Sequence, residues 1–255
     1  MPTSRERVWL SIQHSQPDRV PYYFSFTQAA SRKLEAYYGT TDLDSTLDND
    51  MVRYSIRRPA LMQEVSAGFY RDEFGVLWNR SVDKDIGIPT DHPLKRRLLE
   101  GYPFPDPYDP RRYQGLRTFV KAHPNRFRLI SYSFTLFERA WIMRGMPQLM
   151  VDMLEAPEWV EELFDALTAF NQSVVQELLK YDVDGFLFGD DWGHQQGLLF
   201  SPGLWRRFIK PRLALLIGIV KRAGKAAFIH SCGKVQGLFP DLVEIGLDVF
   251  NPFQP

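Results

Sequence analysis

Apolar positions along the chain change their pattern near residue 110. Beyond that point, short apolar runs alternate with longer stretches whose apolar residues recur every three or four positions. The short runs have the length of buried strands. They cover Phe127–Tyr132, Gly185–Gly189, Ala226–His230 and Leu247–Asn251. The regular order of strand-like and helix-like segments favours a parallel sheet with crossover helices.

The stretches between these runs predict amphipathic helices. The longest has a continuous apolar stripe and begins at Pro157, which suits a first helical turn. Ser201 and Pro202 form a good start for a helix that Pro211 kinks or restarts. The predicted helices are Pro110–Lys121, Phe137–Arg144, Pro157–Tyr181, a segment from Ser201 to Gly224, and Val235–Ile245.

The amino-terminal third is less regular. Glu6–Ile12 and Ala29–Tyr38 read as helices, and Leu47–Ile56 as a weaker one. Arg19–Phe26 is rich in aromatic and β-branched residues and predicts the first strand of the sheet. Arg71–Trp78 suggests a hairpin or edge strand, and proline-rich residues 86–110 suggest an excursion over the surface.

The fold class that fits this order is α/β, of the (β/α)8 TIM-barrel type. No glycine-rich nucleotide-binding motif opens a helix. About five strands are reached by Asn251, whereas a barrel needs eight, so we expect the barrel to be incomplete at its carboxyl end and its edge strands to be unpaired. The expected organisation is one barrel domain over residues 1–255, with an amino-terminal excursion at about 39–110.

Composition narrows the functional classes. Lysine plus arginine equals aspartate plus glutamate at 31 each, so the charge balance indicates neither a nucleic-acid-binding nor a membrane-binding surface. A single cysteine fits a reducing compartment, and the first residues lack the apolar core of a signal peptide. The longest apolar run, Leu213–Val220, is too short to cross a bilayer. The expected location is therefore the cytoplasm.

His230 and Cys232 are the clearest candidates for chemistry. They lie two residues apart at the end of an apolar run, where an extended chain points both side chains to one face. Imidazole and thiolate together can hold zinc, and Gly233 allows a sharp turn beside them. Alternatively, His230 is a hydrogen-bonded core histidine and Cys232 a small buried apolar residue.

Asp190 and Asp191 follow the preceding strand, and they are candidate catalytic residues. Acids at the carboxyl end of a barrel strand are well placed for catalysis or substrate binding. If Asp190 continues the strand, only one of the two points inward, and either could instead accept backbone N–H groups as a structural cap.

Six motifs in the same order resemble the uroporphyrinogen decarboxylase superfamily, which contains the haem-pathway decarboxylase and zinc-dependent, corrinoid-linked methyltransferases. The motifs are Pro17-Asp18-Arg19-Val20-Pro21, Asp72-Glu73-Phe74-Gly75-Val76-Leu77-Trp78, Phe137-Glu138-Arg139-Ala140-Trp141 with Arg144-Gly145, Gly189-Asp190-Asp191-Trp192-Gly193 with Ser201-Pro202, His230-Ser231-Cys232-Gly233 and Asn251-Pro252-Phe253-Gln254-Pro255. The resemblance implies a (β/α)8 barrel and a small-molecule pocket at the strand ends. The residues expected to bind substrate there are Tyr22, Phe24, Phe26, Trp192 and Asn251.

Two features separate the branches. The decarboxylase has an arginine-rich loop after its first strand, whereas this chain has Ser25–Ala30 without arginine at that place. The methyltransferase branch has the H-x-C pattern as two zinc ligands, which His230 and Cys232 match. The resemblance thus implies methyl transfer between a small substrate and a corrinoid carried by a partner protein.

The third zinc ligand of that branch is a second cysteine, which this chain lacks. Two protein ligands form only half of a tetrahedral shell, so weak zinc binding is expected unless Asp190, Asp191 or His194 reaches the His230 strand end. The alternative functions are a metal-free lyase of the decarboxylase type and an inactive truncated member. A homo-oligomer is compatible with either function.

Overall fold

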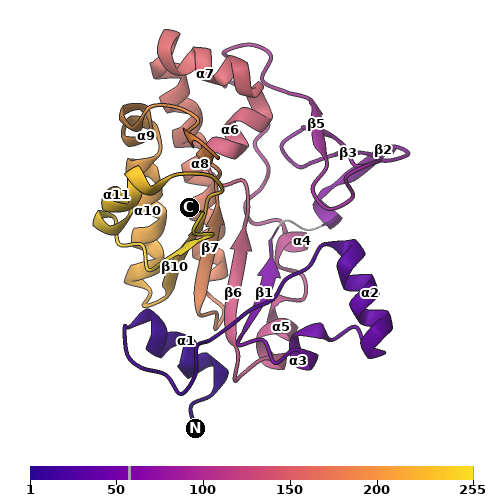
Figure 1. The fold of residues 1–255 in the computed structure, drawn as a ribbon. Coiled ribbons are helices and arrows are strands. Elements are labelled where there is room, and N and C mark those ends of the chain that lie inside the picture. The colour runs from indigo at the N-terminus through magenta and orange to yellow at the C-terminus, as the bar shows by residue number, and fades with distance from the viewer. Residues whose placement is uncertain (57–58, 255) are drawn as a thin grey trace.

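A five-stranded parallel sheet forms the centre of the computed structural model, which describes residues 1–56 and 59–254 (Figure 1). Its strand order is β1-β6-β7-β10-β11, and every neighbouring pair is parallel. The strands are β1 (Met51–Ser55), β6 (Phe127–Tyr132), β7 (Gly185–Gly189), β10 (Ala226–His230) and β11 (Val249–Asn251). Within the described residues β1 and β11 each pair with one strand only, so the sheet does not close into a barrel. The predicted α/β class is confirmed, and so is the count of five strands.

The first strand differs from the prediction. Arg19–Phe26 is not a strand, and the predicted helix over Leu47–Ile56 is wrong because that segment contains β1. Val52 and Tyr54 are buried while Arg53 between them is only partly buried, so the segment follows the two-residue period of a strand. The aromatic residues of 19–26 instead lie in an extended segment that bonds to Asn49 and Asp50.

Helices cover one face of the sheet, shown behind the strands in Figure 1. The other predicted helices are confirmed with small shifts, except that Pro110–Lys121 is interrupted at Gly115, which adopts a φ of 85°. Two helices, α3 (Leu43–Thr46) and α7, lie in segments for which no element was predicted. The helices after β5 are α4 (Pro110–Tyr113), α5 (Leu116–Ala122), α6 (Phe137–Arg144), α7 (Met146–Glu155), α8 (Pro157–Leu178), α9 (Pro202–Phe208), α10 (Lys210–Arg222) and α11 (Phe239–Glu244). The 3-10 turns are η1 (Pro59–Leu61) and η2 (Gln236–Leu238).

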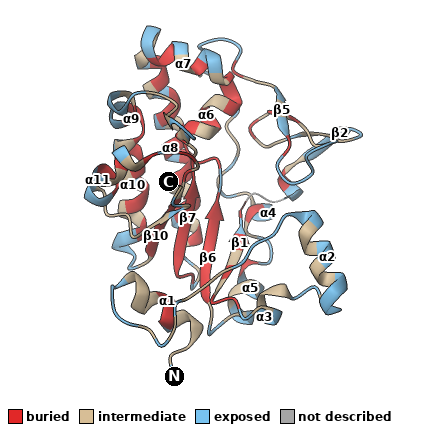
Figure 2. Cartoon of the chain, viewed as in Figure 1, coloured by how far each residue is buried: buried red, intermediate tan, exposed pale blue. Residues whose placement is uncertain are grey.

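The two faces of the sheet bury separate apolar clusters, and the central strands β6 and β7 are buried along their whole length (Figure 2). Residues such as Ile130 and Phe186 face the helices and join the larger cluster. Leu129, Leu187 and Phe228 face the opposite side, where a barrel would have its interior, and pack near Val8 of α1 (Ser4–Ile12). We call this second side the inner face of the sheet.

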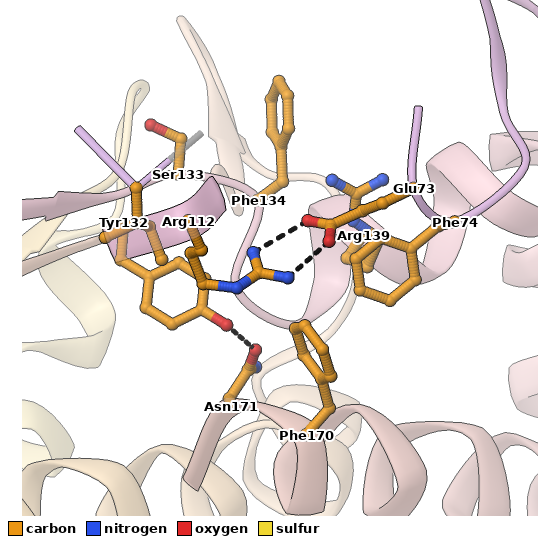
Figure 3. Close-up of a pocket in the computed structure, with 10 residues that line it drawn as sticks. Glu73, Phe74, Arg112, Tyr132, Ser133, Phe134, Arg139, Phe170 and Asn171 are labelled. Atoms are coloured by element: carbon orange, nitrogen blue, oxygen red, sulfur yellow. Dashed lines mark hydrogen bonds and ion pairs between the residues drawn. The ribbon is translucent and has the colours of Figure 1, made fainter. Parts of the chain in front are cut away.

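A second, antiparallel sheet follows β1. Its strands are β2 (Gln63–Ser66), β3 (Phe69–Arg71), β4 (Leu77–Asn79) and β5 (Ile88–Asp91), paired in chain order. The turn between β3 and β4 carries Glu73, which pairs with the buried Arg112 of α4 beside a small pocket (Figure 3). In the same pocket the Tyr132 hydroxyl donates to Asn171 of α8. The contact between Glu73 and Arg112 thus joins this sheet to the helical layer.

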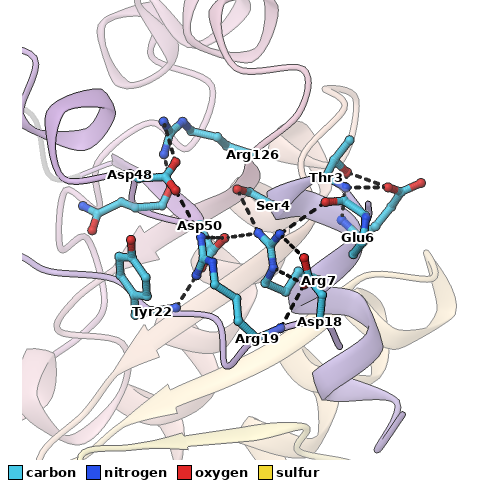
Figure 4. Close-up of polar contacts among 12 residues, drawn as sticks. Thr3, Ser4, Glu6, Arg7, Asp18, Arg19, Tyr22, Asp48, Asp50 and Arg126 are labelled. Atoms are coloured by element: carbon cyan, nitrogen blue, oxygen red, sulfur yellow. Dashed lines mark hydrogen bonds and ion pairs between the residues drawn. The ribbon is translucent and has the colours of Figure 1, made fainter. Parts of the chain in front are cut away.

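The amino-terminal segment is fastened to the start of β1 by a charged network (Figure 4). The carboxylate of the fully buried Asp50 forms ion pairs with the guanidinium groups of Arg7 and Arg19, each with an N–O distance of 2.6 Å. Its carboxylate also accepts the backbone N–H of Tyr22 at 2.9 Å. This network fixes the segment that leads to α2 (Gln28–Tyr38) and α3 (Leu43–Thr46).

None of the helices in residues 1–56 and 59–254 has the length and apolar character needed to span a bilayer.

Candidate metal centre

His230 is the last residue of β10 and lies between Gly189 of β7 and Asn251 of β11. Phe228, two residues earlier, belongs to the inner apolar cluster, so the strand period places His230 on the same inner face. This position is the carboxyl end of the sheet, the edge at which barrel enzymes carry their active sites. The structure therefore places His230 where the sequence predicted it, at the carboxyl end of a central strand.

Three potential ligands meet at this edge. The Cys232 Sγ lies 3.4 Å from the His230 Nε2, and the Asp191 Oδ1 lies 3.9 Å from the same nitrogen. One ligand atom from each of these residues lies within 4.8 Å of the other two, and all three side chains are partly exposed. Asp191 is thus the residue that reaches the His230 strand end. Asp190 and His194 are not part of this group among the described residues.

Neighbouring groups fix the orientation of each ligand. The Asn251 Oδ1 lies 2.9 Å from the His230 Nδ1, and with this oxygen as acceptor the proton sits on Nδ1 and the lone pair on Nε2 faces Cys232. The Cys232 backbone N–H donates to the Asp191 Oδ1 at 2.7 Å. Gln254 accepts the Gly233 backbone N–H at 2.8 Å. Asn251, expected as a substrate contact, therefore holds the histidine ring.

The surroundings of Cys232 are negatively charged. Burial, followed by the charges of Asp191 and Glu138, raises the pKa of the Cys232 thiol above its ordinary value. Burial and the charges of Asp190 and Asp191 also raise the pKa of Glu138 well above the usual value of a glutamate. A cation bound at the three ligands would offset this accumulation of negative charge. Glu138, in the first turn of α6, was named in the sequence only as part of a motif and not as a site residue, because its contact with the strand ends depends on the fold.

Asp190 has a different role from its neighbour. Its carboxylate is buried and accepts the backbone N–H groups of Leu136, Phe137 and Glu138, where α6 begins. It also accepts the Trp192 Nε1–H at 2.7 Å. Burial raises the pKa of Asp190 to about 6, while these four donors act in the opposite direction. Asp190 thus caps the amino end of α6 from the end of β7.

The aromatic residues expected at the site make their recorded contacts with other groups. Trp192 is fully buried and packs edge-on against Trp205, 5.3 Å between ring centroids. The Tyr22 backbone N–H donates to Asp50 (Figure 4), and the Phe24 backbone N–H donates to Asn49. Both acceptors precede β1, so this backbone lies towards the amino end of the sheet. Phe26 is 39% exposed in the segment that continues to α2. Among the described residues, none of these four side chains is hydrogen-bonded to the three ligands, and their role in substrate binding stays a prediction.

The two loops that carry Asp191 and Cys232 touch through their backbones. The Lys234 N–H donates to the His194 carbonyl at 2.9 Å. Gly233 has a φ of 88°, and a Cβ added there would lie 2.2 Å from the carbonyl carbon of Gly193. Only glycine fits this contact, since both the conformation and the space exclude a side chain.

Replacing Gly233 with alanine is expected to destabilise the fold by about 3 kcal/mol or more, from backbone strain combined with overpacking. Thermal unfolding measures the effect. Gly197→Ala is the matched control, because an added Cβ there meets no atom within 4 Å. Equal melting temperatures for the two variants would contradict the close contact.

The chain is thus an α/β protein of the TIM-barrel type, with a candidate metal centre at the carboxyl ends of its strands. A sequence profile of the uroporphyrinogen decarboxylase (URO-D) family matches residues 88–252, and the chain belongs to this family. No curated protein matches it in sequence.

Among solved structures, a methyltransferase from Methanosarcina mazei has a similar fold, with a TM-score of 0.74 and 15% sequence identity. The superposition covers 98% of this chain and 76% of that one. At this identity the match establishes the fold.

Proposed function

We propose that this chain is a zinc-dependent methyltransferase that moves a methyl group between a small substrate and a corrinoid carried by a partner protein. The observation that supports this proposal most directly is the convergence of Asp191, His230 and Cys232 at one strand end. The similarity to a methyltransferase of the same fold also supports it.

The geometry of the three residues fits zinc. In a tetrahedral site with Zn–N of about 2.0 Å and Zn–S of about 2.3 Å, the nitrogen and sulfur lie about 3.5 Å apart. The observed separation of the His230 Nε2 and Cys232 Sγ is 3.4 Å. The 3.9 Å between His230 and Asp191 requires only a small movement of a partly exposed carboxylate. Three protein ligands leave one position for substrate, as catalytic zinc sites do.

Zinc at this position would lower the pKa of a substrate thiol so that it is a nucleophile at neutral pH. The chain's own residues provide the orientation. Asn251 holds the His230 ring with Nε2 directed at the site, and the Cys232 backbone N–H holds the Asp191 carboxylate in place. Asp190, fully engaged with α6 and Trp192, keeps the strand end rigid without facing the reactants.

Metal content of the purified protein, followed by zinc titration against a competing chelator, tests the proposal. We expect one zinc ion per chain, held more firmly than two ligands would allow. Methyl transfer from a methylated corrinoid to a thiol should depend on that ion. A protein that retains no zinc under these conditions would contradict the proposal and would favour the metal-free lyase instead.

A further inference from the structure

A further cavity lies between the small antiparallel sheet and the start of α2, and it shares no residue with the metal centre (Figure 1). Its volume is about 610 Å³, which is within the range of small-molecule sites, about 300–1,000 Å³. Its lining includes Tyr70 of β3, Arg80, Ser81 and Lys84 after β4, and Gln28 of α2. Two of the described lining residues are cations and none is an acid, so the cavity favours an anionic ligand.

Arg80 is held in a fixed direction at the wall of this cavity. Its Nη2 donates to the backbone carbonyls of Lys84 and Asp85. The guanidinium carbon lies 5.8 Å from the centroid of the Tyr70 ring. The arginine stem packs on Gly87, where an added Cβ would lie 2.6 Å from the Arg80 Cγ. The guanidinium is therefore oriented before any ligand binds.

No carboxylate neutralises Arg80 by direct contact. Within residues 1–56 and 59–254, no carboxylate oxygen lies within 4.0 Å of its nitrogens. Its acceptors are the two carbonyls and, at 3.9 Å, the Met62 sulfur, while its Nε is shielded from water without a hydrogen-bond partner in that part of the chain. The buried Arg112, Arg128 and Arg144, by contrast, each pair with a carboxylate. An oriented guanidinium without a counter-ion attracts an anion.

The acids of the same loop are directed to backbone groups. The Asp83 carboxylate accepts three backbone N–H groups of its own turn, and these bonds hold the pKa of Asp83 below its ordinary value. The Asp85 Oδ1 accepts the Gln28 backbone N–H at 3.0 Å. Lys84, between the two acids, is exposed, and its ammonium group forms no ion pair with a described residue. The loop thus presents Arg80 and Lys84 to the cavity without a carboxylate bonded to either.

We propose that this cavity binds a small organic anion, a carboxylate or a phosphate, through Arg80 and Lys84. Arg80 supplies the oriented charge, and Lys84 supplies a second charge on a flexible stem. The volume exceeds what a bare ion needs, and the Tyr70 ring provides a wall for the organic part of the ligand. The proposal goes beyond the proposed function, because the site would bind its ligand with or without a metal at His230.

Calorimetric titration with phenyl phosphate, benzoate and the neutral benzyl alcohol tests the site. Either anion should bind measurably more tightly than the alcohol, and the better of the two identifies the anionic group. Arg80→Gln should lower the affinity for that anion roughly tenfold to a hundredfold, because a charge-assisted hydrogen bond is lost. Arg96→Gln, an exposed arginine outside the cavity, is the matched control and should bind as the parent protein does.

Lys84→Gln keeps the test decisive if Arg80→Gln does not fold. Lys84 is exposed, so the substitution should leave the melting temperature unchanged. It should lower the affinity about twofold to fivefold, because an exposed ammonium group contributes less than an oriented guanidinium. Unchanged affinity in both variants, or no preference for either anion over the alcohol, overturns the proposal.

Hydrogen exchange with and without the bound anion locates the site. The Gln28 side chain donates to the Lys84 carbonyl, and α2 has no buried residue to hold it otherwise. The anion should therefore slow exchange in residues 67–70 and 80–84 and in the first turn of α2. Protection confined to other segments would indicate adventitious binding and overturn the proposal.

The same titration after removal of metal with a chelator separates this site from the metal centre. We expect the affinity of the anion and its dependence on Arg80 to be unchanged. If the anion binds only to the zinc-loaded protein, it is held at the metal centre, and the proposed function stands while this inference fails. If the protein holds no zinc but binds the anion through Arg80, the proposed function fails and this inference stands.

Discussion

Replacing Cys232 with serine is expected to lower the zinc affinity by more than about 100-fold and to abolish methyl transfer, since a hydroxyl is a poor zinc ligand at neutral pH. The melting temperature should change little. Cys232 is only partly buried, and a substitution of this size costs about 1 kcal/mol, or about 2–4 °C for a chain of this length. Competition with a chelator measures the affinity, and a corrinoid demethylation assay measures the activity.

His194→Gln is the control for this experiment. His194 is exposed on the loop that follows Asp191 but lies outside the group of three ligands. We expect that variant to bind zinc as the parent protein does. Retention of tight zinc by Cys232→Ser, or its loss in His194→Gln, would show that the ligand set is assigned incorrectly.

The two adjacent acids are expected to respond in opposite ways to the same change. In the parent protein both Asp190 carboxylate oxygens accept backbone N–H groups. In Asp190→Asn an NH₂ group replaces one of these oxygens and cannot accept, so at least one buried N–H loses its acceptor. The expected loss of stability is about 3 kcal/mol, which corresponds to a decrease in melting temperature of about 6–12 °C. Asp191→Asn should leave the melting temperature within a few degrees, because the Asp191 carboxylate is partly exposed. It should lower zinc affinity at least about tenfold, because a carboxylate ligand is replaced by a neutral amide.

Thermal unfolding and zinc titration on both variants check this contrast. Equal destabilisation by the two substitutions would mean that Asp191 is a structural cap as well. A large loss of zinc in Asp190→Asn at unchanged stability would instead place Asp190 at the metal.

The later strands and helices could be predicted because their residues repeat with the period of the element they form. The first strand could not. Arg53 interrupts the apolar residues of β1, so the segment lacks the continuous apolar run of the later strands. Residues 19–26 have strand-like composition, but their backbone N–H groups donate to the side chains of Asn49 and Asp50 and do not join the sheet. Composition describes what a segment could pair with, whereas pairing depends on distant residues.

The candidate site shows the same limit. Spacing alone placed His230 and Cys232 on one face, because the strand period is local. The choice between Asp190 and Asp191 depended on the start of α6, more than 50 residues earlier in the chain, which occupies the Asp190 carboxylate and leaves Asp191 to turn towards Cys232.

The backbone contact between Gly193 and Gly233 has a consequence for how a metal would be acquired. The two ligand loops are fastened to each other, and to Gln254 and α6, by bonds that involve no metal. The three ligands are therefore positioned by folding of the chain itself, before any metal binds. In a zinc finger, by contrast, the chain becomes ordered only when the ion binds. Loading would be a late and reversible step on a finished protein, and chelation should empty the site without unfolding the chain. Which divalent ion occupies it would then follow from the supply in the cell as much as from the chain's own preference.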